Sequence, residues 1–326
     1  MDEASLEVKI ALQAMTMASA LCRKIGSDLT GKESILKSDK TPVTIADYGS
    51  QAIICKFIKE AFPRDTIVAE EDSRELRKSV HSKILEQVTH YVDEFVLGSS
   101  PQAVCSWIDF SSQVVTDRFW TLDPIDGTKG FLRGDQYAIA LALIENGLTK
   151  LGILACPNLY VDKDRPHGKR GCFFLALRGE GAVQMDIDGG DQRSLSVSKV
   201  SDPSKATITE SVEPDHADHL FHQRLAQKLN ISKPSLQMDS QAKYGIVARG
   251  EATIYLRVPS SSEVGYKEKI WDHAAGSIIA EEAGGKVTDV LGHPLDFSCG
   301  TKMEKNQGII VTNGILHDVV LKALKM

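Results

Sequence analysis

Residues 120–131 constrain what this chain can fold into more than any other segment, because an apolar run ends there in two carboxylates and a turn. Pro124 has no N–H for strand pairing, so we expect a short buried strand that ends there, followed by a tight turn. Asp123 and Asp126 lie three positions apart, and two acids across such a turn can converge on one point. With the Ile125 carbonyl they offer the oxygen ligands that Mg²⁺ prefers. The alternative is a turn without chemistry, because Asp, Pro and Gly favour turns for backbone reasons alone.

The composition is that of an ordinary soluble globular protein, with 42% hydrophobic and 25% charged residues among 326. A formal net charge of −6 argues against a general nucleic-acid binder, but a bound metal can adapt an acidic pocket to a small anion. Six cysteines without a Cys-x-x-Cys pair favour a reducing compartment. We find no secretory signal and no bilayer-spanning apolar run. We therefore expect a monomeric cytoplasmic protein without membrane partners, and an organellar location stays open if a leader was removed.

Paired helices followed by several strands predict an α+β first half with an antiparallel sheet. A helix start is indicated by the capping-box pattern of Thr44 and Asp47, and a β-hairpin by Asn146-Gly147. The hydrophobic patterns predict helices over residues 6–25, 46–62 and 73–97, and strands over residues 66–69, 119–122, 137–145, 150–156, 172–177 and 182–187.

The pattern changes after Ser201-Asp-Pro203, where strands and helices begin to alternate up to the C-terminus. Such alternation predicts a separate, sheet-centred second half. We therefore expect an N-terminal domain over residues 1–200 and a smaller mixed α/β domain over residues 201–326.

Acidic residues stand where predicted elements begin or end, and binding groups gather at such places. Asp47 starts the second helix, Glu70 follows a strand, and Asp272 precedes the helix that begins near His273. Each has a purely structural alternative: Asp47 and Asp272 can cap their helices, and the Glu70-Glu-Asp72 run can be a solvated turn.

Three motifs in this order resemble a known superfamily: Ala69-Glu-Glu71, Asp123-Pro-Ile-Asp-Gly-Thr128 and Trp271-Asp-His-Ala-Ala-Gly276. It is the Mg²⁺-dependent, lithium-sensitive phosphomonoesterase superfamily that includes inositol monophosphatase. Within it, four further segments look like the 3′(2′),5′-bisphosphate nucleotidases of plants and fungi: Ser38-Asp-Lys-Thr-Pro-Val-Thr44, Phe131-Leu-Arg-Gly-Asp-Gln-Tyr137, Asp239-Ser-Gln-Ala-Lys-Tyr244 and Glu268-Lys-Ile-Trp-Asp272. The likeness covers nearly the whole chain.

The resemblance implies a layered αβαβα sandwich with its site between the two halves. It also implies removal of the 3′-phosphate from 3′-phosphoadenosine 5′-phosphate, giving AMP, and the same reaction on the sulfated analogue, 3′-phosphoadenosine 5′-phosphosulfate. Asp47 and Thr128 would lie at the attacking water. Two or three Mg²⁺ ions would be held by Glu70, Asp123, the Ile125 carbonyl, Asp126 and Asp272.

The same likeness assigns the substrate contacts, mostly to the second half. Ser240 and Lys243 would hold the 5′-phosphate and ribose region. His216 would lie along the nucleotide, and Arg257 or Lys269 would add charge. Independently of the likeness, the backbone amides of Gly127 and Thr128 could face phosphate oxygens, because Gly127 permits a close approach. The chain departs from the family at Pro214-Asp-His-Ala217, where Gly-Ala-His-Ser is usual, and Asp215 adds a carboxylate beside an anionic ligand. Apart from the resemblance, Lys243 would be read as a surface lysine.

Two rival functions remain open at this point. An inositol phosphate phosphatase, acting on inositol 1-phosphate or 1,4-bisphosphate, would share the metal motifs, and a nucleotide sensor without catalysis would keep the fold. A separate hypothesis concerns Cys156 and Cys172, which bracket a charged loop between two predicted neighbouring strands. These thiols can pair under oxidation as a redox switch, or they are simply two buried small hydrophobic side chains.

Overall fold

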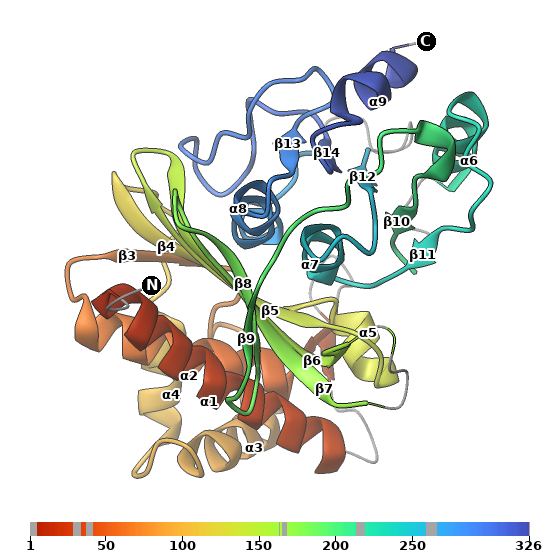
Figure 1. Ribbon diagram of the computed structural model, residues 1–326. Helices are drawn as coiled ribbons and strands as arrows, with labels where there is room; N and C mark the ends of the chain where they lie inside the picture. Colours follow the sequence, from red (N-terminus) through yellow and green to blue (C-terminus); the bar gives the residue numbers. More distant parts are fainter. Residues whose placement is uncertain are drawn as a thin grey trace.

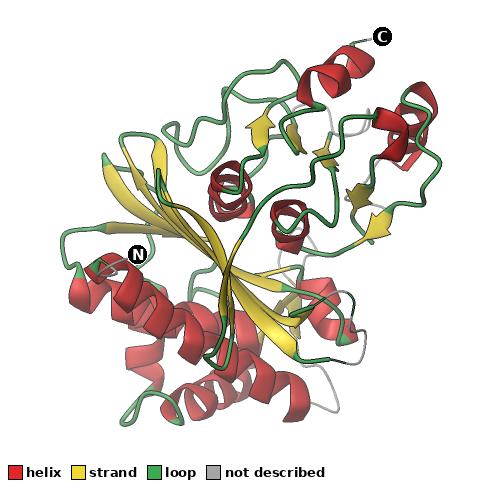
Figure 2. Ribbon diagram, in the orientation of Figure 1, coloured by secondary structure: helices red, strands yellow, loops and turns green. Residues whose placement is uncertain are grey.

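Helices and sheets alternate in five layers in the computed structural model, which describes residues 5–28, 34–36, 42–162, 164, 168–212, 219–258 and 266–325. Figure 1 shows α1 (Leu6–Asp28) and α2 (Ile45–Ala61) on one face of a seven-stranded sheet, and α7 (Ala242–Ala248) and α8 (Ala274–Glu282) on the other. A five-stranded sheet follows, and α6 (His219–Lys228) and α9 (His317–Leu324) cover its outer face. The expected αβαβα sandwich is confirmed (Figure 2).

The described residues form three hydrophobic cores between these layers. One joins α1 and α2 to the first sheet, the second joins that sheet to α7, α8 and the smaller sheet, and the third lies under α6 and α9. Close backbone approach tightens the second core, because a Cβ on Gly152 would lie 2.7 Å from the Ala275 carbonyl oxygen. The two halves of the chain therefore share a core, and the expected division near residue 200 stays a prediction.

The strand orders agree with the expected sheet types, with one exception. The seven-stranded sheet has the order β3 (Thr66–Ala69), β4 (Arg118–Asp126), β5 (Ala138–Glu145), β6 (Leu148–Tyr160), β7 (Arg170–Leu177), β8 (Gly181–Asp186) and β9 (Gln192–Ser194). The five-stranded sheet has the order β11 (Leu236–Gln237), β10 (Ile208–Glu210), β12 (Ile254–Arg257), β14 (Ile309–Thr312) and β13 (Lys286–Thr288). The first sheet is antiparallel except for the β3–β4 pair, which is parallel. The second sheet is mixed, as expected.

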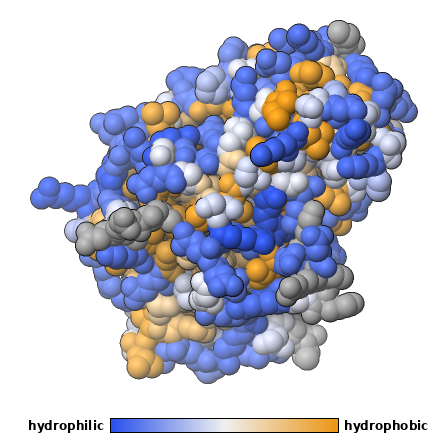
Figure 3. Space-filling model, viewed as in Figure 1, coloured by the Kyte–Doolittle hydropathy of each residue, from blue (hydrophilic) through white to orange (hydrophobic). Residues whose placement is uncertain are grey.

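Short elements complete the described parts of the chain. They are β1 (Ser34–Leu36), β2 (Pro42–Thr44), α3 (Ser82–Asp93), α4 (Pro101–Ile108), α5 (Thr128–Arg133) and the 3₁₀ turns η1 (Ser79–His81), η2 (Pro203–Lys205) and η4 (Ile270–Asp272). None of the helices in the described ranges is long and apolar enough to span a bilayer. On the face seen in Figure 3, hydrophobic side chains form small separate groups among hydrophilic ones.

Local sequence signals set two boundaries as expected. The Thr44 side chain accepts hydrogen bonds from the Ala46 and Asp47 amides, and the Asp47 carboxylate accepts one from the Thr44 amide, so the capping box at α2 is confirmed. Asn146 and Gly147 have φ angles of 51° and 76°, the positive values that a two-residue hairpin turn between β5 and β6 requires.

Two expectations about element boundaries were wrong. Pro124 does not end strand pairing, because β4 continues to Asp126 and a register shift between Asp123 and Asp126 accommodates the missing N–H. Residues 73–97 do not form one helix, since α3 begins only at Ser82. The amide and hydroxyl of Ser73 donate to the Asp109 carboxylate at 2.9 and 2.6 Å, a tertiary contact that local propensity does not reveal.

Candidate active site

The acidic residues singled out from the sequence converge at one end of the first sheet. Glu70 directly follows β3. Asp123 and Asp126 lie among the last residues of β4, and Asp272 is the last residue of η4. These four line a cavity of about 210 Å³ between the two halves of the chain. The other lining residues are Ile125, Gly127, Thr128, Lys129, Gly130, Ser211, Asp239, Ser240, Gln241, Lys243, Tyr255, Arg257, Tyr266, Glu268 and His273.

The irregular end of β4 presents several oxygen donors to this cavity. The Ile125 amide donates to Asp123 Oδ1 at 3.1 Å, which turns the backbone around Pro124 and fixes the Asp123 carboxylate. Gly127 then has φ 87°, and a Cβ there would lie 3.2 Å from the Ser240 Cβ. Glycine is therefore required for the backbone to turn and for the second half to approach so closely.

The charges at the site repel one another in the absence of a cation. Burial raises the pKa of Asp123 well above its usual value, and the neighbouring charges of Glu70 and Asp126 raise it further. Burial also raises the pKa of Asp126 and of Asp272. Hard oxygen donors held together against such repulsion fit a hard divalent cation, because a bound cation would offset both the burial cost and the repulsion.

Asp47 lies beside this cluster and contacts Thr128. Its Oδ2 accepts from the Thr44 amide at 2.8 Å and from the Thr44 hydroxyl at 2.5 Å, while Oδ1 accepts from the Thr128 hydroxyl at 3.4 Å. Thr128 Oγ1 also lies 3.1 Å from the Ile125 carbonyl oxygen. One carboxylate oxygen therefore caps α2, and the other faces the residue that opens α5, so capping does not exclude a role at the site.

Asp272 is not the N-cap of α8, because His273 occupies that position. Asp272 lies in η4 with its carboxylate at the cavity, so its capping alternative is wrong. The backbone amide of Gln241 donates to Asp126 Oδ2 at 2.6 Å and thereby joins β4 to the start of α7. The site is thus assembled from both halves.

Two cationic side chains, Lys243 and Arg257, line the same cavity. Lys243 is 6% exposed, and its ammonium donates to the Met238 carbonyl at 3.1 Å and lies over the Tyr255 ring. Burial lowers the pKa of Lys243 to about 8, although Asp126 and Asp239 oppose the shift. Its interpretation as a surface lysine is therefore wrong. Arg257 pairs with the Glu268 carboxylate at 3.0 Å.

Three further candidates have different outcomes. Ser240 lines the cavity with φ 67°, a strained backbone for a non-glycine residue. Lys269 is not among the lining residues, and its ammonium lies over the Trp271 ring at 5.1 Å. His216 lies outside the described residues.

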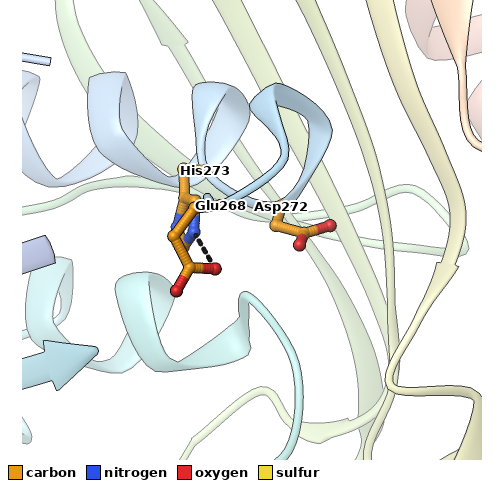
Figure 4. Close-up of side chains that lie close together, drawn as sticks. All are labelled: Glu268, Asp272 and His273. Carbon is orange, nitrogen blue, oxygen red and sulfur yellow. Dashed lines mark hydrogen bonds and ion pairs between the residues drawn. The ribbon is translucent and has the colours of Figure 1, made fainter. Parts of the chain in front are cut away.

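Glu268 and His273 lie next to Asp272 and received no role from the sequence. His273 Nε2 lies 3.3 Å from Glu268 Oε2, and its Nδ1 lies 2.8 Å from the Tyr244 hydroxyl. Figure 4 shows Glu268 facing His273 while Asp272 points to the other side. Burial alone would raise the pKa of Glu268, but His273 and Arg257 lower it to about 2. The three residues lie close enough together to hold a metal. The Glu268 carboxylate, however, is already paired with Arg257 and His273.

Cys156 and Cys172 are directly opposite each other on β6 and β7. Opposed residues of an antiparallel pair have Cα atoms about 4.5–5.5 Å apart, within the range that a disulfide spans. Both are free and buried, and burial raises the pKa of Cys156 well above its usual value and that of Cys172 to about 12. The positions suit a bond, whereas the buried thiols disfavour the reactive thiolate. The redox hypothesis stays a prediction.

The fold and the cavity define a layered α+β sandwich with a carboxylate site of the kind that holds divalent cations. The chain belongs to the inositol monophosphatase family, whose model matches residues 1–325. A 3′(2′),5′-bisphosphate nucleotidase of Oryza sativa is 43% identical over 98% of this chain and 93% of its own length. One from Dictyostelium discoideum is 41% identical over 97% of this chain and 95% of its own length. A solved IMPase of Thermotoga maritima shares the fold, with a TM-score of 0.66, 22% identity, and coverage of 100% of this chain and 97% of that chain.

Proposed function

We propose that this protein is a Mg²⁺-dependent 3′(2′),5′-bisphosphate nucleotidase. It hydrolyses the 3′-phosphate of 3′-phosphoadenosine 5′-phosphate to give AMP and phosphate, and acts likewise on 3′-phosphoadenosine 5′-phosphosulfate. One observation supports this most: the same cavity is lined by a carboxylate cluster and by the buried Lys243. Relatives that match nearly the whole chain carry the name of this activity.

The carboxylate cluster would hold two or three Mg²⁺ ions through Glu70, Asp123, Asp126, Asp272 and the Ile125 carbonyl. When bound, such ions lower the pKa of a water and neutralise the charge that develops on the leaving oxygen. The positions of the ligands follow from the end of β4 and from η4, which lie in different halves of the chain.

Thr128 and Asp47 would activate the attacking water. The Thr128 hydroxyl can donate to Asp47 Oδ1 or to the Ile125 carbonyl oxygen. If that carbonyl holds a cation, the Thr128 proton would be directed at Asp47, and the Thr128 lone pairs would accept a hydrogen bond from that water. The water oxygen forms a bond to phosphorus while the bond from phosphorus to the 3′-oxygen breaks. The water proton passes through Thr128 to Asp47, and the 3′-oxygen takes a proton from solvent. No covalent enzyme intermediate is required.

The cationic side chains that line the cavity would select a substrate with a second anionic group. Lys243 and Arg257 would face the 5′-phosphate, and the rings of Tyr255 and Tyr266 line the same region beside the nucleoside. Ser240 joins this region to the carboxylate cluster, because it adjoins both Gly127 and α7.

The deciding experiment compares phosphate release from 3′-phosphoadenosine 5′-phosphate, its sulfated analogue, inositol 1-phosphate and inositol 1,4-bisphosphate, with Mg²⁺ and with EDTA. We expect Mg²⁺-dependent release, fastest from the nucleotides and inhibited by lithium. Faster turnover of the inositol compounds would identify an inositol phosphate phosphatase instead. Tight nucleotide binding without phosphate release would identify a sensor. Size-exclusion chromatography with light scattering tests the monomer that we include in the proposal.

A further inference from the structure

Two buried glutamines, Gln51 in the first half and Gln241 in the second, bind the backbone next to candidate metal ligands. Both side chains are almost completely buried, at 0% and 2% exposed. Neither was singled out from the sequence. Each side-chain amide forms hydrogen bonds with main-chain atoms of segments far away in the sequence. Its carbonyl oxygen accepts and its NH₂ group donates.

Gln51 holds the backbone directly after Glu70. Its Nε2 donates to the Glu71 carbonyl at 2.6 Å, and its Oε1 accepts from the Glu71 amide at 3.0 Å. The same Nε2 also lies 3.2 Å from the Ile108 carbonyl oxygen, which ties in the end of α4. Gln51 lies one helical turn after Asp47 on α2. One rigid helix thus carries the proposed base and fixes the segment that presents Glu70.

Gln241 makes the corresponding contacts at Asp272. Its Nε2 donates to the Trp271 carbonyl at 2.9 Å, and its Oε1 accepts from the Gly276 amide at 3.2 Å. Its own backbone amide donates to Asp126 Oδ2 at 2.6 Å. Gln241 therefore contacts Asp126 of β4 and both flanks of Asp272, and so joins candidate ligands that come from different halves.

We propose that Gln51 and Gln241 are positioning residues that hold Glu70, Asp126 and Asp272 at the spacing a divalent cation requires. The inference rests on the proposed metal site. Mg²⁺ demands near-ideal octahedral geometry. Carboxylates that come from separate elements can meet that demand only if the backbone beside each of them is held in place, and the hydrogen bonds of Gln51 and Gln241 do this. A neutral amide achieves this with one donor and one acceptor and adds no charge to the cluster.

The experiment replaces each glutamine by methionine, which keeps the length of the side chain and removes both hydrogen-bonding groups. A matched control is Gln184→Met on β8, because Gln184 is also buried and donates to a backbone carbonyl, that of Val161, at 3.0 Å. Gln184 does not line the cavity. Mg²⁺ binding is measured by calorimetry on the full chain without substrate, thermal unfolding is followed without metal, and kcat and KM are measured as functions of Mg²⁺ concentration.

We expect Gln51→Met and Gln241→Met to weaken Mg²⁺ binding about 10- to 100-fold, as loss of groups that orient metal ligands does. Gln184→Met should lower the unfolding temperature comparably and leave Mg²⁺ binding within about twofold of wild type, because distant sites act independently. Should a methionine variant fail to fold, the asparagine variants at the same three positions provide the same comparison.

Equal loss of stability in all three variants with unchanged Mg²⁺ affinity would overturn the inference and leave the glutamines as ordinary core residues. A wild-type protein that binds no Mg²⁺ would give a different result, since it would refute the proposed metal site and this inference with it. If the wild-type protein binds Mg²⁺ and the variants bind it with the same affinity, only the positioning inference fails and the proposed metal site stands.

Discussion

Replacement of Lys243 by methionine should change which phosphate ester the enzyme prefers. The buried ammonium donates to Met238, and within the described part of the chain this is its one hydrogen bond to protein, which leaves two N–H groups for a ligand. Arg257 is already paired with the Glu268 carboxylate at 3.0 Å, so we expect the contact with Lys243 to matter more for a second phosphate. Methionine fills a similar volume without the charge.

The size of the effect follows from the burial of the ammonium. Removing one partner of a buried, hydrogen-bonded charge pair costs about 2–5 kcal/mol. Since about 1.4 kcal/mol corresponds to a factor of ten, kcat/KM for 3′-phosphoadenosine 5′-phosphate should fall roughly 30- to 4,000-fold. Adenosine 3′-monophosphate has no 5′-phosphate to lose contact with, so its kcat/KM should change by less than about threefold.

The assay is phosphate release from both nucleotides at saturating Mg²⁺. Lys269→Met is the matched control, because the Lys269 ammonium lies over Trp271 and outside the cavity lining. It should leave the ratio of the two kcat/KM values unchanged. An equal loss on both nucleotides in Lys243→Met would refute the reasoning, because it would place the ammonium at the reacting phosphate or in the fold itself.

The pH dependence gives a second test of the same charge. Burial lowers the pKa of Lys243 to about 8, so in the free enzyme the ammonium is largely protonated at pH 7 and loses its proton as the pH rises through 8. We expect kcat/KM for the bisphosphate to decline above pH 8, and the decline to be absent in Lys243→Met. A bisphosphate profile that stays flat up to pH 9 would contradict this assignment.

Three further predictions concern the metal site and the stability of the fold. Asp126→Ala should lower turnover by at least about 10²-fold while circular dichroism stays unchanged, and near-normal turnover would remove Asp126 from the metal site. Gly276→Ala would place a Cβ 2.3 Å from the Tyr244 ring, so urea unfolding should show a loss of about 1–3 kcal/mol; an unchanged midpoint would contradict that packing. Burial lowers the pKa of His317 to about 4, so the unfolded state binds more protons between pH 6.5 and 4. The free energy of unfolding should therefore fall on acidification through that window, by about 2 kcal/mol after solvent screening, and His317→Asn should lose this slope.

Local signals were sufficient for much of the site. The capping box placed Asp47 at the start of α2, and the end of an apolar run placed Asp123 at the end of a strand, although it put Asp126 in a turn that the structure includes in β4. These predictions depend on residues within a few positions of one another, where backbone preferences dominate. That the acids lie together did not follow from such preferences and came from the likeness to a known superfamily.

The sequence did not reveal the groups that fix these acids in place. Gln241 contacts Asp126, Trp271 and Gly276, and these segments are neighbours only after the two sheets have packed around α7 and α8. The same is true of Glu268, whose partners Arg257 and His273 determine whether it is a free carboxylate. A buried polar side chain is specified by what surrounds it, and that information is tertiary.

The cavity lining has a carboxylate zone, formed by Glu70, Asp123, Asp126 and Asp272, and a cationic zone, formed by Lys243 and Arg257. The different origins of these two zones explain how one fold can serve different phosphate esters. Most of the carboxylates come from the ends of β3 and β4, whereas Lys243 and Arg257 come from α7 and β12. The zones meet at the turn between Asp239 and Gln241, which is held on one side by the Arg133–Asp239 ion pair at 2.5 Å and on the other by Asp126. Substitutions on α7 and β12 can therefore change the anion that is recognised without moving β4. A change within the turn itself has to disturb both zones, because the Gln241 backbone amide donates to Asp126 and the Ser240 carbonyl accepts from the Lys243 backbone amide.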